Sequence, residues 1–163
     1  MKRAYVSIGS NIDRETNVRS AIAQLRRRYG RLIISPIYES EAVGFVGAAF
    51  YNGVIGLCTN ADALTLNAEL RAIERAHGRR RNAAKFCSRS LDLDLLTWGD
   101  AVMQHPELIL PRPEILEQAY VLRPLADIAG DVRHPLDGQT LHALWLQLKP
   151  SAQAMRVVEL ALD

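Results

Sequence analysis

Short apolar runs and helical repeats alternate along the first hundred residues. Runs typical of β-strands occupy residues 4–8, 32–38, 50–58 and 91–98. A helix is predicted after the first run. Another is predicted over residues 62–77, with Asp62 as its cap and Gly78 as its stop. The inward positions of the two helices are Val18, Ile22, Leu25, Leu66, Leu70 and Ile73. The order β-α-β-β-α-β predicts a ferredoxin-like α+β fold, in which two helices cover one face of an antiparallel sheet. The other face would be available for ligands.

The remaining segments have weaker patterns. Pro36 lies inside the second predicted strand and indicates an edge or a bulge there. Gly9, Ser10 and Asn11 are typical of a turn after the first strand. Beyond the ferredoxin-like part, a C-terminal extension is predicted, in which residues 114–129 are helical with a break near Pro124. Residues 141–148 form a short helix, residues 155–162 a strand or a helix, and residues 39–49 and 79–88 are loops.

Length and composition fit one compact domain over residues 1–163. The chain is 48% hydrophobic and has a formal charge of +2, which is too mild to mark a general nucleic-acid or membrane binder. Two cysteines without a metal or disulfide pattern fit a reducing compartment. No apolar run approaches the roughly 20 residues of a membrane-spanning helix. We therefore expect a cytoplasmic protein, and a monomer rather than an oligomer.

Two aspartates alternate with leucines in the last predicted strand. Leu91, Leu93 and Leu95 would enter the core, while Asp92 and Asp94 project together from the opposite face, with Cα atoms about 6–7 Å apart. Two acids this close repel each other unless a cation lies between them. Mg²⁺ prefers oxygen ligands and commonly takes one or two carboxylates together with substrate phosphates. The pair therefore predicts a magnesium site, although a solvated sheet face is the simpler alternative.

A basic segment precedes the acidic pair. Its planar guanidinium groups match phosphate oxygens, and together with the acids they indicate phosphoryl transfer. The residues are Arg79, Arg80, Arg81, Lys85 and Arg89. In the third predicted strand, Phe50 and Asn52 share a face and join an aromatic surface to an amide, a combination that suits a flat heteroaromatic ring.

In order along the chain, these motifs resemble the 6-hydroxymethyl-7,8-dihydropterin pyrophosphokinase family of the folate pathway. The resemblance covers residues 4–130. It rests on I-G-S-N at 8–11, F-Y-N at 50–52, Glu74, G-R-R-R at 78–81, R-S-L-D-L-D at 89–94 and Y-V-L-R-P-L at 120–125. It implies transfer of pyrophosphate from ATP to the hydroxymethyl group of the pterin, which yields AMP and the pterin diphosphate.

The resemblance also implies roles for individual residues. Asp92 and Asp94 would hold two Mg²⁺ ions that bridge the ATP phosphates. Catalytic contacts to the phosphates would come from Arg79, Arg81, Lys85 and Arg89, and further nucleotide contacts from Glu74, Leu95 and Arg112. The pterin would lie between Phe50 and Tyr120, with Asn52 and the backbone near Ser40 and Val43 reading its amide edge. Phe86 stands where the family usually has a tryptophan over the pterin.

Several positions depart from the family pattern. Cys87 and Ser88 replace a Gly-Pro pair, Arg112 replaces a histidine, Gln118 replaces an arginine, and residues 40–49 lack the usual prolines. One alternative is therefore a divergent paralogue that acts on a modified pterin, or that binds pterin or nucleotide without turnover. A second is an RNA-binding module, because RNA-recognition domains share the four-stranded arrangement, although their aromatic pattern is missing here.

Overall fold

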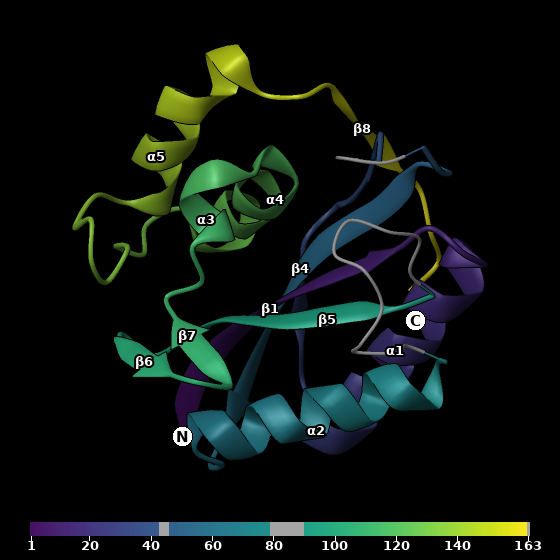
Figure 1. Ribbon diagram of the computed structural model, residues 1–163, viewed down its shortest axis with the longest axis horizontal. Helices are drawn as coiled ribbons and strands as arrows, with labels where there is room; N and C mark the ends of the chain where they lie inside the picture. Colours follow the sequence, from purple (N-terminus) through teal and green to yellow (C-terminus); the bar gives the residue numbers. More distant parts are fainter. Residues whose placement is uncertain (43–45, 79–89, 163) are drawn as a thin grey trace.

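An antiparallel sheet runs through the molecule and has helices on both faces (Figure 1). The computed structural model describes residues 1–42, 46–78 and 90–162. Six strands form the sheet, in the order β5-β1-β4-β3-β8, with β2 also paired to β4. They are β1 (Lys2–Ser10), β2 (Ile33–Ile34), β3 (Ile37–Ser40), β4 (Phe50–Thr59), β5 (Asp92–Trp98) and β8 (Met155–Val158). The predicted α+β class and antiparallel sheet are confirmed.

Helices α1 (Arg14–Tyr29) and α2 (Ala63–Ala76) pack on one face of the sheet. Their apolar positions meet the strand residues that point the same way, and together they form the larger hydrophobic core. The Asp62 side chain accepts a 2.8 Å hydrogen bond from the Thr65 N–H, so it caps α2 as the sequence indicated. The core includes Val6, Ile8, Val18, Ile22, Leu25, Leu66, Leu70, Leu93 and Leu95.

The C-terminal extension adds helices to the second face. These are α3 (Glu114–Glu117), α4 (Ala119–Ala129) and α5 (Leu141–Leu148), and a short 3-10 helix, η1 (Lys149–Ser151), follows. Val121, Leu122 and Leu125 of α4 join Tyr5 and Val54 of the sheet in a second core. Part of the face that the sequence left available for ligands is therefore covered by protein.

The predicted helical break near Pro124 is wrong. The helix is interrupted at Gln118, whose φ and ψ of −119° and 121° are extended and separate α3 from α4. Pro124 lies inside α4. A proline there removes one backbone donor from the helix, and Pro124 is buried, as are its helix neighbours Leu122 and Leu125.

Other boundaries also differ from the sequence-based prediction. Pro36 separates the predicted second strand into β2 and β3, and the supposed turn residues Gly9 and Ser10 belong to β1, where they pair with Asn52 and Tyr51. Residues 155–158 are a strand. A hairpin of β6 (Met103–His105) and β7 (Leu108–Leu110) was not predicted. Within the described ranges, no helix combines the length and the apolar character needed to cross a bilayer.

Candidate active site

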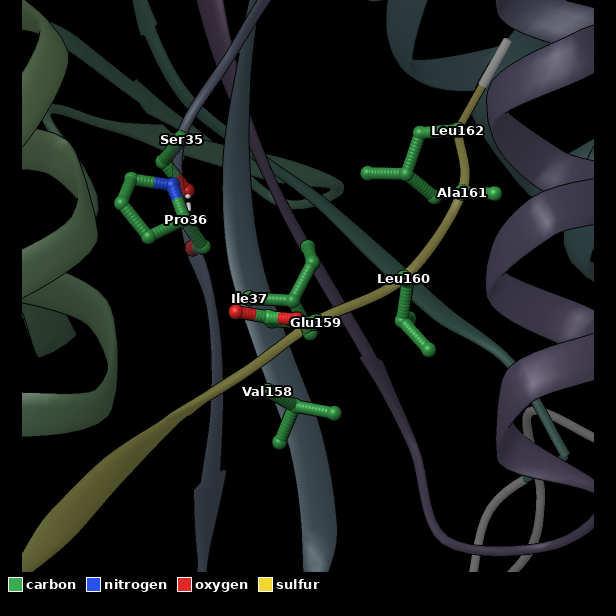
Figure 2. Close-up of a pocket in the computed structure, with 8 residues that line it drawn as sticks. All are labelled: Ser35, Pro36, Ile37, Val158, Glu159, Leu160, Ala161 and Leu162. Carbon is green, nitrogen blue, oxygen red and sulfur yellow. Dashed lines mark hydrogen bonds between the residues drawn. The ribbon is translucent and has the colours of Figure 1, made fainter.

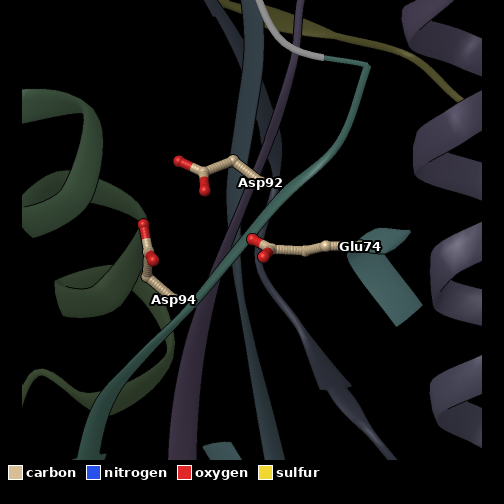
Figure 3. Close-up of side chains that lie close together, drawn as sticks. All are labelled: Glu74, Asp92 and Asp94. Atoms are coloured by element: carbon tan, nitrogen blue, oxygen red, sulfur yellow. The ribbon is translucent and has the colours of Figure 1, made fainter. Parts of the chain in front are cut away.

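The acidic pair lies on the second face of β5, as the alternation predicted. Leu91, Leu93 and Leu95 are fully buried in the larger core, and Asp92 and Asp94 are only half-buried. Figure 3 shows both aspartates pointing away from Glu74, which reaches β5 from the other side. The strand therefore separates an apolar side, held by α2, from an acidic side that faces α3 and α4.

Glu74 brings a third carboxylate to this strand. One carboxylate oxygen from each of Glu74, Asp92 and Asp94 lies within 4.8 Å of the other two. Glu74 is 1% exposed, and its Oε2 accepts a 2.7 Å hydrogen bond from the Leu93 N–H on the outer edge of β5. Burial raises the pKa of Glu74, and the Asp94 charge adds to this, although Arg71 and the Leu93 N–H act in the opposite direction.

Two arginines contact the same oxygen of Asp94. Arg71 Nη2 lies 3.3 Å and Arg112 Nη2 3.6 Å from Asp94 Oδ1. Arg112 also donates from Nε to Glu114 at 2.5 Å. Burial tends to lower the pKa of Arg112, but the carboxylates of Asp94 and Glu114 outweigh it and the pKa is raised. Arg112 therefore stays charged, and the two guanidinium groups lie where they compensate the carboxylates on the acidic side of β5.

An amide-lined region continues from the acids across the same face. In the sheet register, Gly9 pairs with Asp92 on one side and with Asn52 on the other. Asn52 is 7% exposed and donates a 2.9 Å hydrogen bond from Nδ2 to Ser40 Oγ, which fixes its amide. A Cβ atom at position 9 would lie 3.0 Å from Asn52 Oδ1 and 3.8 Å from the Phe50 ring. Glycine at this position therefore keeps the space between the acids and the amide open.

Helix α4 brings Tyr120 to the acidic end of this region. Burial, followed by the charges of Glu114, Asp92 and Asp94, raises the pKa of Tyr120 to about 12. The helix is tied to β3, because the Tyr38 hydroxyl donates a hydrogen bond to Asp127 Oδ2. The Arg123 guanidinium carbon lies 4.8 Å from the centre of the Tyr38 ring, a cation–π contact. Tyr120 is thus held on a helix that is anchored to the sheet.

The last residue of β1 and the residues that follow it hold two segments beside the site. Ser10 is fully buried and donates a 2.6 Å hydrogen bond from Oγ to the carbonyl of Ser90, two residues before Asp92. Asn11 Nδ2 donates to the Ala48 carbonyl at 3.1 Å, and Arg14 Nη1 to the Ala49 carbonyl at 2.9 Å. This motif therefore does more than turn the chain, because it fixes residues that flank the acids and Phe50.

The predicted site residues fall into three groups. The structure brings together Ser40, Phe50, Asn52, Glu74, Asp92, Asp94, Arg112 and Tyr120 around the second face and the adjoining edge of β5. Leu95 is fully buried in the larger core, so only its backbone could contact a nucleotide. Six predicted residues lie outside the described ranges: Val43, Arg79, Arg81, Lys85, Phe86 and Arg89.

A separate cavity lies at the other edge of the sheet. It has a volume of about 430 Å³ and lies between β3 and the segment that continues β8 (Figure 2). None of the predicted site residues lines it. Its walls are Ser35, Pro36, Ile37 and residues 158–162.

Sequence reasoning missed two residues that support the site: Arg71, which contacts Asp94, and Ser10, which contacts Ser90. Arg71 stands three residues before Glu74 on a helix, and this spacing was the available signal, since residues three apart share a helix face. The sequence pattern at Ser10 predicts only a turn. Its long-range bond to the Ser90 carbonyl could not be inferred from neighbours in the sequence.

Comparisons with known proteins identify the family of this chain. Residues 5–130 match the family model of 7,8-dihydro-6-hydroxymethylpterin-pyrophosphokinase (HPPK). A 2-amino-4-hydroxy-6-hydroxymethyldihydropteridine pyrophosphokinase from Pseudomonas aeruginosa is 38% identical over 148 residues, which cover 88% of this chain and 90% of that protein. The Bacillus subtilis enzyme of the same name is 35% identical over 133 residues, 79% of each chain.

A solved structure shares the fold at much lower identity. A crystal structure of an HPPK-DHPS protein in complex with substrates has a TM-score of 0.74 and 12% identity, over 92% of this chain. This chain spans 44% of that longer protein. The match over most of the chain and the close relatives in two bacteria show that this chain belongs to the 7,8-dihydro-6-hydroxymethylpterin-pyrophosphokinase family.

Proposed function

We propose that the second face of the sheet is where this chain brings ATP and its pterin substrate together, with the acidic pair at one end and the Asn52 amide at the other. Membership of the family gives the reaction, which is transfer of pyrophosphate to hydroxymethyldihydropterin in folate synthesis with ATP as co-substrate. One observation carries the assignment. Asp92, Gly9 and Asn52 stand side by side on neighbouring strands, so a phosphate site and a ring site adjoin.

The carboxylates fit the metal that the family implies. Asp92 and Asp94 are half-buried on one face of β5, and their oxygens and a Glu74 oxygen lie within 4.8 Å of one another. Hard oxygen donors at this density suit Mg²⁺. We assign two Mg²⁺ ions to Asp92 and Asp94; when bound, they would neutralise phosphate charge and orient the transferred group. Glu74 Oε2 accepts from the Leu93 N–H and Oε1 accepts from Arg71, so we assign Glu74 a supporting role beside the metal site.

The pterin would be read by groups whose orientation the fold already fixes. The Asn52 amide donates to Ser40, so its oxygen is left to face the space above Gly9, where it can accept a hydrogen bond from a ring amino or amide group. Phe50 and Tyr120 would provide the apolar walls for a flat ring. With the ring held there, the hydroxymethyl oxygen would lose its proton and attack the β-phosphorus of ATP. The bond from that phosphorus to the oxygen that bridges it to the α-phosphorus would break, and AMP would leave with that oxygen.

The nucleotide would lie toward Arg112 and the basic segment. Arg112 is charged and lies beside Asp94, where its guanidinium can reach an incoming phosphate. We assign phosphate binding to Arg79, Arg81, Lys85 and Arg89, and we assign Phe86 to cover the pterin ring. They rest on the sequence motif alone, since they lie outside the described ranges.

A product assay tests this function. Incubation with ATP, Mg²⁺ and 6-hydroxymethyl-7,8-dihydropterin should release AMP and form the pterin diphosphate. Reactions that lack the pterin or contain EDTA serve as controls. Release of ADP, or release of AMP without the pterin, would contradict the proposal. Calorimetric pterin binding without any turnover would instead favour the divergent, non-catalytic alternative.

The RNA-binding alternative needs an exposed sheet face. Helix α4 packs on that face through Val121, Leu122 and Leu125, which argues against it. We also propose that the chain is a single domain, monomeric and cytoplasmic. Light scattering coupled to size-exclusion chromatography, with an expected mass near 18.2 kDa, tests the monomer.

A further inference from the structure

We infer that Arg71 is a positioning residue for the proposed metal site, which it serves by holding Asp94 and Glu74 in fixed relation across the edge of β5. The inference rests on the proposed function, because it gives Asp94 a cation to bind. Arg71 is assigned no contact with substrate.

Arg71 is anchored on its own helix at two points. Its Nη1 lies 2.6 Å from Glu74 Oε1, one turn ahead, and its Nη2 lies 3.4 Å from Asn67 Oδ1, one turn behind. The Arg71 side chain is 15% exposed and that of Glu74 is 1% exposed, so these contacts are largely removed from water. A guanidinium held at both sides has little freedom to rotate.

The same guanidinium then reaches across the strand. Its Nη2 also contacts Asp94 Oδ1 at 3.3 Å, although Asp94 points to the acidic side of β5 and Arg71 comes from α2 (Figure 3 shows Glu74 and Asp94). This crossing is possible because β5 stands at the end of the sheet, with β1 on one side. Glu74 accepts a hydrogen bond from the Leu93 N–H at that edge, which links α2 to β5. Because Arg71 contacts both Glu74 and Asp94, these contacts connect the helix, the strand edge and Asp94.

The consequence is a fixed carboxylate at the metal site. Arg71 and Arg112 both contact Oδ1 of Asp94, from the helix and from the segment before α3. Metal sites lose affinity when the partners that orient a ligand are removed, even though the ligand itself remains. A planar fork is needed to reach Glu74, Asn67 and Asp94 together, and the single ammonium of a lysine cannot reproduce it.

The substitution Arg71→Lys separates positioning from charge, because it keeps the positive charge and removes the fork. Mn²⁺ is titrated into the protein saturated with an ATP analogue whose α,β-bridging oxygen is replaced by methylene, and free Mn²⁺ is followed by electron paramagnetic resonance. We expect Arg71→Lys to weaken Mn²⁺ binding by about 10-fold or more. Arg19→Lys, on the exposed surface of α1, is the matched control and should leave binding unchanged.

Asn67→Ala provides a second variant that removes one anchor and leaves Arg71 in place. It should also weaken Mn²⁺ binding, by a smaller factor than Arg71→Lys. Unchanged Mn²⁺ affinity in both variants, with or without a lower melting temperature, overturns the inference. Asp94→Asn is measured beside them: if it abolishes Mn²⁺ binding while Arg71→Lys does not alter it, only the role of Arg71 fails. If Asp94→Asn leaves binding intact, the proposed metal site itself fails.

Discussion

Replacing Glu74 with alanine should destabilise the protein far more than an ordinary surface substitution. The change leaves the Leu93 N–H without its 2.7 Å acceptor, and an unsatisfied buried donor costs about 1–3 kcal/mol. It also deprives Arg71 of its 2.6 Å partner, while the contacts to Asp94 and Asn67 remain. Breaking a buried ion pair costs about 3–5 kcal/mol. Because Arg71 keeps two partners, we expect the free energy of unfolding to fall by about 3 kcal/mol, the lower end of the range for a broken buried ion pair.

Urea unfolding followed by circular dichroism measures this loss directly. For a chain of this length, 1 kcal/mol corresponds to roughly 2–4 °C in melting temperature, so Glu74→Ala should melt about 6–12 °C below the wild type. Glu74→Gln keeps an acceptor for Leu93 and loses only the charge, so it should cost about half as much.

Glu15→Ala is the control for removing a carboxylate from a helix. Glu15 pairs with Arg19 at 3.5 Å, and both side chains are at least half exposed, so the expected loss is about 0.5 kcal/mol or less. Equal stability of Glu74→Ala and Glu15→Ala would refute the supporting role of Glu74. If Glu74→Gln proved as damaging as Glu74→Ala, the charge rather than the Leu93 hydrogen bond would dominate.

Three further substitutions test the site and its support. Asp94→Ala should lower kcat on the order of 100-fold or more, because it removes a proposed metal ligand. Pterin affinity, measured by calorimetry, should change little, because no contact to the pterin ring is removed. Equal loss of kcat and pterin affinity would contradict the assignment. Gly9→Ala places a Cβ 3.0 Å from Asn52 Oδ1 and should weaken pterin binding about 10-fold. Gly56→Ala is the control in the same sheet: its Cβ would lie 3.0 Å from the Tyr5 ring, so it should lower stability and leave pterin affinity unaltered. Burial, together with the hydrogen bond to Asp127, raises the pKa of Tyr38 from 10.0 to about 12, so its stabilisation is complete below pH 10 and is lost as the pH rises toward 12. The stability advantage of the wild type over Tyr38→Phe in urea should therefore shrink between pH 10 and 12, and a constant difference would argue against the shift.

Local periodicity was sufficient to predict the sheet and the acidic pair. Alternation fixes which side chains share a face, so Asp92 and Asp94 could be placed opposite Leu93 without knowing the fold. The placement of Phe50 and Asn52 followed in the same way. Asp62 and Gly78 bounded α2 closely, because capping chemistry is local.

Contacts between distant segments could not be predicted in this way. The apolar residues of α4 indicated a helix, but no local pattern specified that Val121 and Leu125 would cover the second face of the sheet. Pro124 suggested a break, but α4 continues through it. The sequence pattern did not single out Arg71, since its 3.3 Å contact with Asp94 exists only after β5 lies beside α2.

The strand β8 has a practical consequence for anyone who attaches a label to this enzyme. It pairs Met155 with Ser40, the residue that orients Asn52, and Arg26 Nη1 binds the Leu162 carbonyl at 2.9 Å. Removing or displacing this segment would expose the backbone of β3 beside the Asn52 amide, to which we assign recognition of the pterin. Met1 is 82% exposed at the far end of β1, so fluorophores and affinity peptides belong there.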